Sequence, residues 1–377
     1  MMRPPHVLLI ACLTAALSSC HTKSDTLFSR LKSGETGITF SNDIEPYEDN
    51  LLNPLDYDYL YNGGGVAIAD FNNDGKQDIY FSGNKVSSRM YLNDGDGKGK
   101  PLHFRDVTTE SGTGTKQWAT GVSAVDINQD GWMDLYVCMA GPSDNPADKV
   151  NRLFINTGVR PSGVPPSGKA ADNRSAGAVP KFREMAHEYG LDDTGYSTQA
   201  AFLDYDRDGD LDCYLLTNLV VKSNRNVVRP KYVNGESPST DRLYRNDGKR
   251  HFTNVSREEG INIEGYGLGV AVSDLNADGW PDIYVANDFL SNDLVWINQH
   301  DGAGRHTGFR NRAGDFLKHT SWNGMGMDVA DINNDARPDV LVVDMLPESS
   351  PRQKQMMMKL NVDLFQLLKT MNYETQQ

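Results

Sequence analysis

The chain repeats one pattern of apolar and polar positions five times. In each copy, an apolar stretch rich in small residues leads into a polar loop of nine residues, and a second apolar stretch with β-branched and aromatic residues follows the loop. Short apolar runs on both sides of a polar loop predict two antiparallel strands joined in a hairpin. The second strand of each hairpin is expected at residues 79–81, 135–137, 213–215, 283–285 and 340–342.

Two further apolar runs follow four of the hairpins and complete a unit of four strands. The third strand is expected at residues 89–93, 152–156, 242–246 and 293–298, and the fourth near Phe104, Phe182, Phe252 and Phe309. Four antiparallel strands that recur along a chain are typical of propeller blades, which bury their faces against their neighbours. We therefore predict an all-β fold, a β-propeller of four-stranded antiparallel blades, with about four and a half to five blades present. The repeats cover residues 36–345, and a short helical or irregular tail follows over residues 346–377.

The polar loops carry side-chain oxygens at fixed positions. Aspartate occupies positions one, five and nine of every loop, and asparagine or aspartate occupies position three. Position six is glycine in four loops, which suits the positive φ of a tight turn, whereas Ala336 stands there in the fifth and is expected to strain it. Oxygens at alternate positions converge when the chain turns tightly, and hard oxygen ligands suit calcium.

We predict about one calcium ion per repeat and up to five in all, with the fifth site the least certain. The expected ligands stand at positions one, three, five and nine of the loops: Asp70, Asn72, Asp74, Asp78, Asp126, Asn128, Asp130, Asp134, Asp204, Asp206, Asp208, Asp212, Asp274, Asn276, Asp278, Asp282, Asp331, Asn333, Asp335 and Asp339. An EF-hand is excluded because its twelfth position needs a glutamate, and here an apolar residue stands there.

Catalysis is not expected. Paired carboxylates can hydrolyse glycosides, but a catalytic pair is needed once, whereas these carboxylates recur in every repeat, as structural ions would. The chain also shows no zinc-protease histidine cluster, no nucleophile elbow and no phosphate-binding loop. We therefore expect no enzyme.

One aromatic residue stands just before the first strand of each repeat. These residues are Tyr61, Trp118, Tyr196, Tyr266 and Trp322, and amides or an acid lie beside them at Asn62, Gln117, Gln199, Asn287, Asp288 and Asn323. They are expected around the mouth of the central channel, at the end of the strands opposite the calcium loops. Flat apolar rings beside amide groups suit a sugar. The alternative is that the rings pack between blades, and their exposure to solvent separates the two.

The net charge and the N-terminal residues indicate which partners and which location to expect for the chain. Acidic residues outnumber basic ones by 51 to 37, and the resulting net charge of -14 argues against nucleic acid. Residues 1–20 have the charged, apolar and small-residue regions of a signal peptide, and the sequence Leu17-Ser18-Ser19-Cys20 resembles the bacterial lipoprotein box. We expect lipidation at Cys20, a linker over residues 21–35, and export to a membrane-anchored position in the cell envelope, with the outer membrane favoured. An ordinary secretion signal or an uncleaved anchor is the alternative.

Two further features of the sequence are a pair of cysteines in strand-like segments and one long connection within the second blade. Cys138 and Cys213 lie in strand-like segments at different offsets, and we expect buried thiols there in preference to a disulfide, which an exported protein would permit. Residues 158–180, rich in Pro, Gly and Ser, are expected to form a mobile loop between the third and fourth strands of the second blade.

The repeated motifs resemble those of the FG-GAP or VCBS repeat proteins, in the branch that includes cartilage acidic protein and bacterial proteins with an ASPIC/UnbV tail. The matching elements are Gly-Val-Ala-x-x-Asp at residues 65–70, Asp-x-Asn-x-Asp-Gly-x-x-Asp at residues 70–78, Asp-Ile-Tyr after the loop, and Leu-Tyr-x-Asn-Asp-Gly at residues 243–248. The resemblance implies an integrin-α-like, calcium-bound propeller, commonly of seven blades, that works in adhesion or recognition.

The chain departs from that family in two ways. The fifth repeat shows two strands before Met345, and no ASPIC/UnbV tail follows, which predicts that the chain is the N-terminal part of a longer protein with an open propeller edge. Residues 37–42 resemble a fourth strand that would complete the final blade. The predicted function is recognition of a glycan or of an envelope or extracellular protein. A scaffold in an envelope complex, or a non-catalytic part of a larger enzyme, is the alternative.

Overall fold

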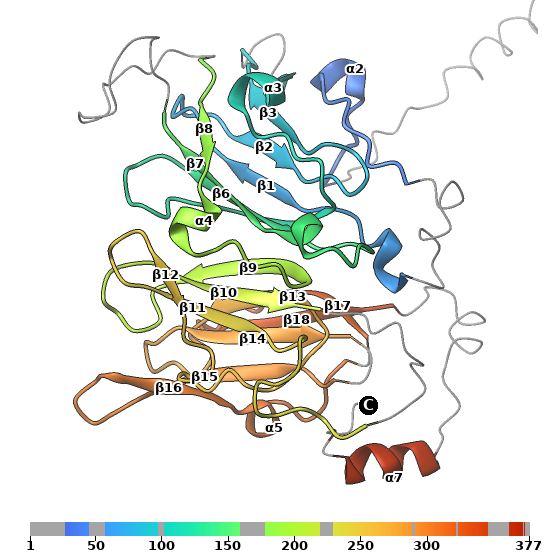
Figure 1. Ribbon diagram of the computed structural model, residues 1–377, viewed down its shortest axis with the longest axis vertical. Coiled ribbons are helices and arrows are strands. Elements are labelled where there is room, and N and C mark those ends of the chain that lie inside the picture. Colours follow the sequence, from blue (N-terminus) through green and yellow to red (C-terminus); the bar gives the residue numbers. More distant parts are fainter. Residues whose placement is uncertain are drawn as a thin grey trace, which may run out of the picture.

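The computed structural model of the 377-residue chain describes residues 27–44, 57–96, 102–158, 178–218, 229–288, 291–321, 323–345, 362–371 and Tyr373. Within these residues the protein consists of four four-stranded antiparallel sheets and one two-stranded sheet (Figure 1). The predicted all-β fold of four-stranded antiparallel blades is confirmed, with four complete blades and the first half of a fifth.

Each complete blade contains four strands in sequence order from one edge to the other. Blade one comprises β1 (Val66–Ala69), β2 (Asp78–Phe81), β3 (Arg89–Asn93) and β4 (Phe104–Asp106). Blade two comprises β5 (Ala119–Val125), β6 (Asp134–Met139), β7 (Arg152–Asn156) and β8 (Phe182–Glu184). Blade three comprises β9 (Ser197–Leu203), β10 (Asp212–Thr217), β11 (Arg242–Asn246) and β12 (Phe252–Asn254). Blade four comprises β13 (Gly267–Ser273), β14 (Asp282–Asn287), β15 (Leu294–His300) and β16 (His306–Asn311), and blade five comprises β17 (Gly324–Ala330) and β18 (Asp339–Asp344).

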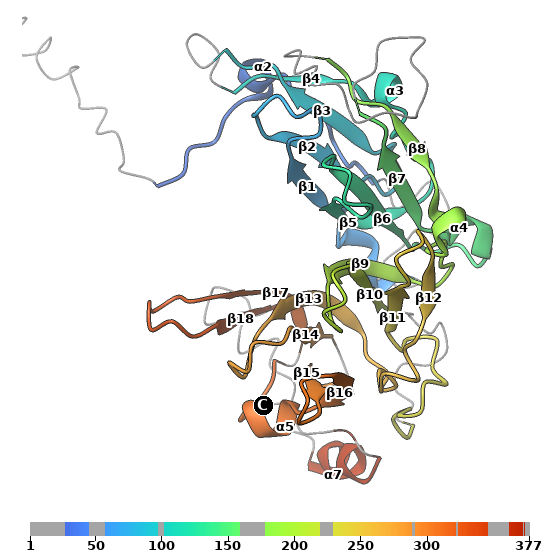
Figure 2. The same cartoon turned by 90° about the vertical axis from the view of Figure 1, so that its left-hand side faces the viewer.

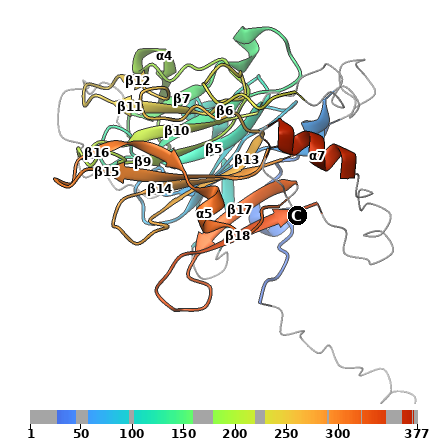
Figure 3. The same ribbon diagram turned by 90° about the horizontal axis from the view of Figure 1, so that it is seen from below.

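The helices are short and lie between or beside the blades. They are α2 (Ser33–Thr36), η1 (Asp58–Tyr61), α3 (Thr108–Ser111), η2 (Pro146–Lys149), α4 (Ala186–Tyr189), α5 (Ala313–Phe316) and α7 (Val362–Thr370). The expected C-terminal helix is α7, which Figure 3 shows outside the sheets. Its C-terminal end joins the segment before β11, where the Lys231 N–H donates to the Met371 carbonyl over 3.1 Å. Among the described residues, no helix is long and apolar enough to cross a membrane.

Successive blades contact one another through their first strands. β1 lies against β5, β5 against β9, β9 against β13 and β13 against β17, so the blades follow an arc with blade one and blade five at its ends (Figure 2). Glycine permits this close approach, because a Cβ on Gly65 would lie 2.8 Å from the Val122 nitrogen of the next blade. The Gly65 N–H also donates to the Thr120 carbonyl over 2.8 Å, which ties the two first strands together.

The hydrophobic cores lie between blades. Tyr80 of blade one packs with Leu135 of blade two, and Cys138 and Cys213 lie in the core between blades two and three. Both cysteines are buried free thiols in the described structure, as predicted, and burial raises the pKa of each thiol. Because every core needs two blades, each blade depends on its neighbours for stability.

The two ends of the arc expose apolar side chains. Val66 and Ile68 of β1 are 53% and 60% exposed, and Leu341 and Val343 of β18 are 54% and 52% exposed. These residues lie on faces that the interior blades bury against a neighbour. The described part of the chain therefore has the open edge that the sequence predicted.

The N-terminal segment covers part of blade one. A Cβ on Gly37 would collide with the Phe104 carbonyl that starts β4, just as Gly190 and Gly260, at the ends of blades two and three, approach Phe252 and Phe309 of the next blade. Residues 33–37 thus sit on blade one as the end of a preceding blade would. Residues 37–42, which resemble a fourth strand, pair with no strand in the described structure.

Side chains hold this segment in place. Phe40 stacks on Phe81 with ring centroids 5.1 Å apart, and Asn42 donates through Nδ2 to Asn84 Oδ1 over 2.6 Å. Residues 1–20, including Cys20, lie outside the described residues, and so does Trp322. The long connection of blade two does run between its third and fourth strands, and its residues 159–177 also lie outside the described residues.

Candidate metal loops and candidate ligand pocket

The backbone of every acidic loop is left-handed at two positions. Position six has a positive φ in all five loops, and Ala336 adopts φ 65° where the other loops have glycine, as the sequence predicted. Position four is left-handed as well, with φ 56° at Asn73 and 63° at Arg207. Two left-handed residues separated by one position fold the loop tightly, so that its side chains turn inward.

This turn brings together the side chains at positions one, three and five. In the first loop, the Asp74 N–H donates to Asp70 Oδ1 over 3.0 Å and to Asn72 Oδ1 over 3.1 Å. One N–H can reach both oxygens only if they converge. The same pair of bonds recurs in the second, fourth and fifth loops.

The third loop concentrates the most negative charge. Ligand oxygens of Asp204, Asp206 and Asp208 all lie within 4.8 Å of one another. Asp204 Oδ1 is buried and has no hydrogen-bond partner among the described residues. Burial and the neighbouring Asp208 raise the pKa of Asp206. Three carboxylates with an unsatisfied buried oxygen fit a divalent cation such as calcium.

The aspartate at position nine has a structural role in addition to the predicted ligand role. Asp78 accepts the Phe71 N–H over 3.0 Å through one oxygen and the Asn93 N–H over 2.8 Å through the other. It therefore ties the loop to the end of the third strand, and the next three loops repeat this arrangement. Burial is the main cause that raises the pKa of these carboxyls, to about 7, 8, 8 and 6 in Asp78, Asp134, Asp212 and Asp282.

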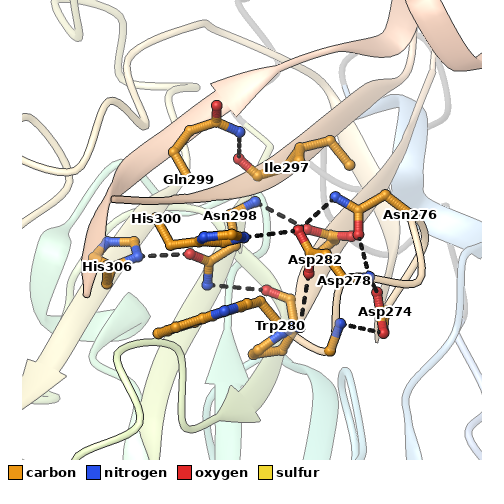
Figure 4. A network of polar contacts seen from close by, with 12 residues as sticks. Asp274, Asn276, Asp278, Trp280, Asp282, Ile297, Asn298, Gln299, His300 and His306 are labelled. Carbon is orange, nitrogen blue, oxygen red and sulfur yellow. Dashed lines mark hydrogen bonds and ion pairs between the residues drawn. The ribbon is translucent and has the colours of Figure 1, made fainter. Parts of the chain in front are cut away.

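The fourth loop is bounded by aromatic and basic groups (Figure 4). His300 stacks on Trp280 with ring centroids 5.4 Å apart, and its Nε2 lies 3.3 Å from Asp278 Oδ2. The Arg207 guanidinium of the preceding blade lies 4.0 Å from the centroid of the Trp280 ring. Sequence reasoning missed His300, because nothing along the chain places it beside a loop some twenty residues earlier.

Side chains at position four link each of the first three loops to the next loop. Asn73 Nδ2 donates to the Gly131 carbonyl over 3.0 Å, and Gln129 Nε2 donates to the Gly209 carbonyl over 2.7 Å. Arg207 donates in the same way to the Gly279 carbonyl. The fourth loop has Ala277 at this position, which carries no donor, so the series ends there.

A pocket of about 430 Å³ lies at the opposite end of the first strands. Its aromatic lining comes from Tyr57, Tyr59, Tyr61 and Trp118, and its amides come from Asn62, Gln199 and Asn218. Glycines of the inner strands and the apolar Leu268 and Met325 complete the wall. The pocket is concave, and its lining mixes aromatic rings with hydroxyl and amide groups.

The structure brings two of the five predicted rings, Tyr61 and Trp118, into this pocket. Tyr61 is 64% exposed, which favours binding, whereas Trp118 is partly buried and packs edge-on against Tyr57 with ring centroids 5.8 Å apart. Tyr196 and Tyr266 are partly buried and do not line it, and the Lys149 ammonium lies 4.5 Å from the Tyr196 ring centroid.

Three lining residues were missed by sequence reasoning. Tyr57 and Tyr59 alternate with Tyr61 along the chain, and this spacing was the available signal. The Tyr59 hydroxyl donates to Asp288 Oδ2 over 2.9 Å. Burial and the Asp288 charge raise the pKa of Tyr59, and a hydrogen bond with the Asn218 side chain opposes that rise. Asn218 follows β10 and is 4% exposed.

Comparison with known families identifies the repeats. The model of the FG-GAP-like repeat matches residues 70–137, 232–285 and 274–342, which span the acidic loops of blades one, two, four and five. Over these ranges the chain is similar to the FG-GAP-like repeat.

Other comparisons add less. No curated protein sequence matches the chain. Among solved structures, the chain is similar to the V. cholerae biofilm matrix protein Bap1, with 11% sequence identity and a TM-score of 0.29. The match covers 74% of this chain and 65% of that chain, so the chain matches less than two thirds of the length of Bap1.

Proposed function

We propose that this protein is a recognition module that binds a glycan in the pocket between the first strands of its FG-GAP-like repeats. The observation that carries the proposal is the lining of the pocket, where the exposed Tyr61 ring and the partly buried Trp118 ring stand beside amide groups. Tyrosine and tryptophan faces pack against the C–H groups of a sugar ring, and amides bond its hydroxyls.

A glycan fits this site better than a protein surface does. Specific protein interfaces are broad surfaces that bury about 800 Å² on each partner. The site here is instead a concave pocket of about 430 Å³. Its volume suits a few sugar rings or one short side chain. The acidic chain also disfavours nucleic acid, because phosphate binding needs a basic face.

Calcium binding by the five acidic loops is the second part of the proposal. Positions one, three and five supply converging oxygens, and a buried carboxylate oxygen of Asp204 in the third loop has no hydrogen-bond partner among the described residues, which supports a cation there. Calcium would supply positive charge to these carboxylates and so strengthen the hairpins. The Asp residues at position nine would serve both the metal and the backbone N–H groups.

The cell-envelope location belongs to the proposal as well. The signal-like residues 1–20 and the Leu17-Ser18-Ser19-Cys20 sequence support a lipid anchor at Cys20. A protein held at the outside of a membrane could present its pocket to surrounding polysaccharide. Mass spectrometry of the N-terminal peptide from membranes tests the anchor, and an unmodified Cys20 would contradict it.

Binding to a glycan array in calcium tests the proposed function. Wild-type protein should bind, and the Tyr61→Ala and Trp118→Ala variants should each lose most of the signal because each ring provides stacking surface. The Phe28→Ala variant is the matched control, because Phe28 is exposed but lies outside the pocket. Absence of binding by the wild type, together with a fixed envelope partner that survives both pocket variants, would instead favour a scaffold.

A further inference from the structure

We infer that Asn84 is a positioning residue for the pocket, and that the N-terminal segment of residues 37–42 keeps it in place through Asn42. The inference rests on the proposed function, since it concerns how the protein holds the pocket rings ready for a glycan. Asn84 is not among the described residues that line the pocket. It acts through the two backbone segments that carry Tyr61 and Trp118.

The Asn84 side chain bonds both of these segments. Asn84 follows β2 at the pocket end of blade one and is 2% exposed. Its Nδ2 donates to the Gly63 carbonyl over 3.1 Å and to the Ala119 carbonyl over 2.9 Å. Gly63 stands two residues after Tyr61, and Ala119 directly follows Trp118. One amide group therefore joins blades one and two and sets the spacing of the backbones that carry the two rings.

Asn42 fixes the orientation of this amide. Asn42 Nδ2 donates to Asn84 Oδ1 over 2.6 Å, and the Asn84 N–H donates to Asn42 Oδ1 over 3.0 Å. Because the amide oxygen of Asn84 faces Asn42, the amide nitrogen faces the two carbonyls and can donate one hydrogen to each. The stacking of Phe40 on Phe81 holds the N-terminal segment on blade one beside this pair.

The bond to Gly63 acts where packing does not hold the chain. Gly63 has φ 78°, and a Cβ there would meet no atom within 4 Å. It is the first of three consecutive glycines at residues 63–65, and glycine has the greatest backbone freedom of all residues. Tyr61 is 64% exposed and gains little from packing. The place of the Tyr61 ring therefore depends on hydrogen bonds to the backbone that carries it.

The equivalent residues of blades three and four hold the same stretch of chain. Like Asn84, each stands six residues after the last aspartate of its loop. Asn218 forms a side-chain hydrogen bond with Tyr59, and the Tyr59 hydroxyl donates to Asp288 Oδ2 over 2.9 Å. Three blades thus use one position of the repeat to hold residues 59–63 at the pocket.

Alanine variants separate this role from a purely structural one. Asn84→Ala removes both bonds to the carbonyls, and alanine already occupies the equivalent position of blade two as Ala140. Asn42→Ala keeps Asn84 but frees its amide to turn. The matched control is Asn156→Ala, because Asn156 Nδ2 also donates to one carbonyl in each of blades one and two, but at the end that carries the acidic loops.

Fluorine NMR reports the position of the rings without any glycan. The chain has five tryptophans, and in protein labelled with 5-fluorotryptophan the Trp118→Phe variant assigns the Trp118 line. Tyr57 packs on Trp118 with ring centroids 5.8 Å apart, so a movement of residues 57–63 changes the magnetic environment of Trp118.

We expect Asn84→Ala and Asn42→Ala to shift or broaden the Trp118 line. Asn156→Ala should leave this line unchanged although it lowers the unfolding midpoint, because the bonds that it removes lie far from the pocket. An unchanged Trp118 line in both Asn84→Ala and Asn42→Ala, or an equal change in Asn156→Ala, would overturn the inference.

The glycan array connects the position of the rings to binding. Well below the unfolding midpoint, Asn84→Ala should weaken binding about fivefold or more, because the glycan must then order a ring that the wild type holds in advance. Asn156→Ala should bind as the wild type does. Full binding by folded Asn84→Ala would overturn the inference. A wild type that binds no glycan, while Asn84→Ala still changes the Trp118 line, would contradict the proposed function and support the positioning role.

Discussion

Single residues in left-handed conformations shape the acidic loops. Glycine at position six was expected from the sequence, because only glycine adopts a positive φ at little cost. The left-handed residue at position four was not expected, because Gln129, Arg207 and Ala277 are ordinary side chains with no turn preference. Their conformation follows from the closure of the loop and shows where local sequence preferences are overridden.

The cost of the left-handed conformation can be measured at position six. A Cβ on Gly131 would meet no atom within 4 Å, so Gly131→Ala changes the backbone preference alone and should reduce the free energy of unfolding by about 1–2 kcal/mol. Ala336→Gly should raise it by a similar amount, because Ala336 already has φ 65°. Urea unfolding in calcium measures both, and no change in either variant would contradict this explanation of the glycine pattern.

At the scale of the elements, hydrogen bonds join successive acidic loops to one another. The bonds from position four to the next loop's carbonyl join blades one to four at the end opposite the pocket. They could not be predicted, because three different donors, Asn73, Gln129 and Arg207, serve the same purpose. The strands, by contrast, were predictable, because apolar runs and acidic loops alternate in every repeat.

Restoring the missing link between the fourth and fifth loops should stabilise blade five. In Ala277→Asn, the new amide should reach the Ala336 carbonyl and add about 1 kcal/mol to the free energy of unfolding. The control is Ala277→Gly, which relieves the left-handed conformation but adds no donor. Thermal unfolding should place the asparagine variant above the glycine variant, and the reverse order would show that the link contributes nothing.

The carboxyls at position nine predict a dependence of stability on pH in metal-free buffer. Burial raises the pKa of Asp134 and Asp212 to about 8, far above about 4 in the unfolded chain. Between these values the folded protein binds more protons than the unfolded one, so its stability should fall as pH rises from about 4 to about 8.

Variants assign that dependence to the loops. Asp134→Asn should flatten the decrease in the unfolding midpoint between pH 5 and pH 8, and Asp43→Asn, at an exposed carboxylate outside the loops, should leave it unchanged. Calcium should oppose the decrease because it favours the ionised carboxylates. A midpoint that rises with pH in metal-free buffer would refute the assignment.

For the whole molecule, the sequence repeats predicted the blades but not the pocket. The five loops, the four complete blades and the half blade followed from sequence spacing. The pocket did not, because it depends on how blades curve around one axis. That curvature brings Tyr61, Trp118 and Asn218 from three blades together and leaves Tyr196 and Tyr266 outside the lining.

The central claim is that the acidic loops hold calcium and thereby stabilise the blades that form the pocket. Its most direct test is thermal unfolding of the purified protein in calcium, in magnesium, and after chelation. We predict a calcium-specific rise in the midpoint of about 5 °C or more, as linkage predicts when an ion binds only the folded state. The Asp208→Ala variant should lose part of this rise. Identical midpoints in the three conditions would contradict the claim.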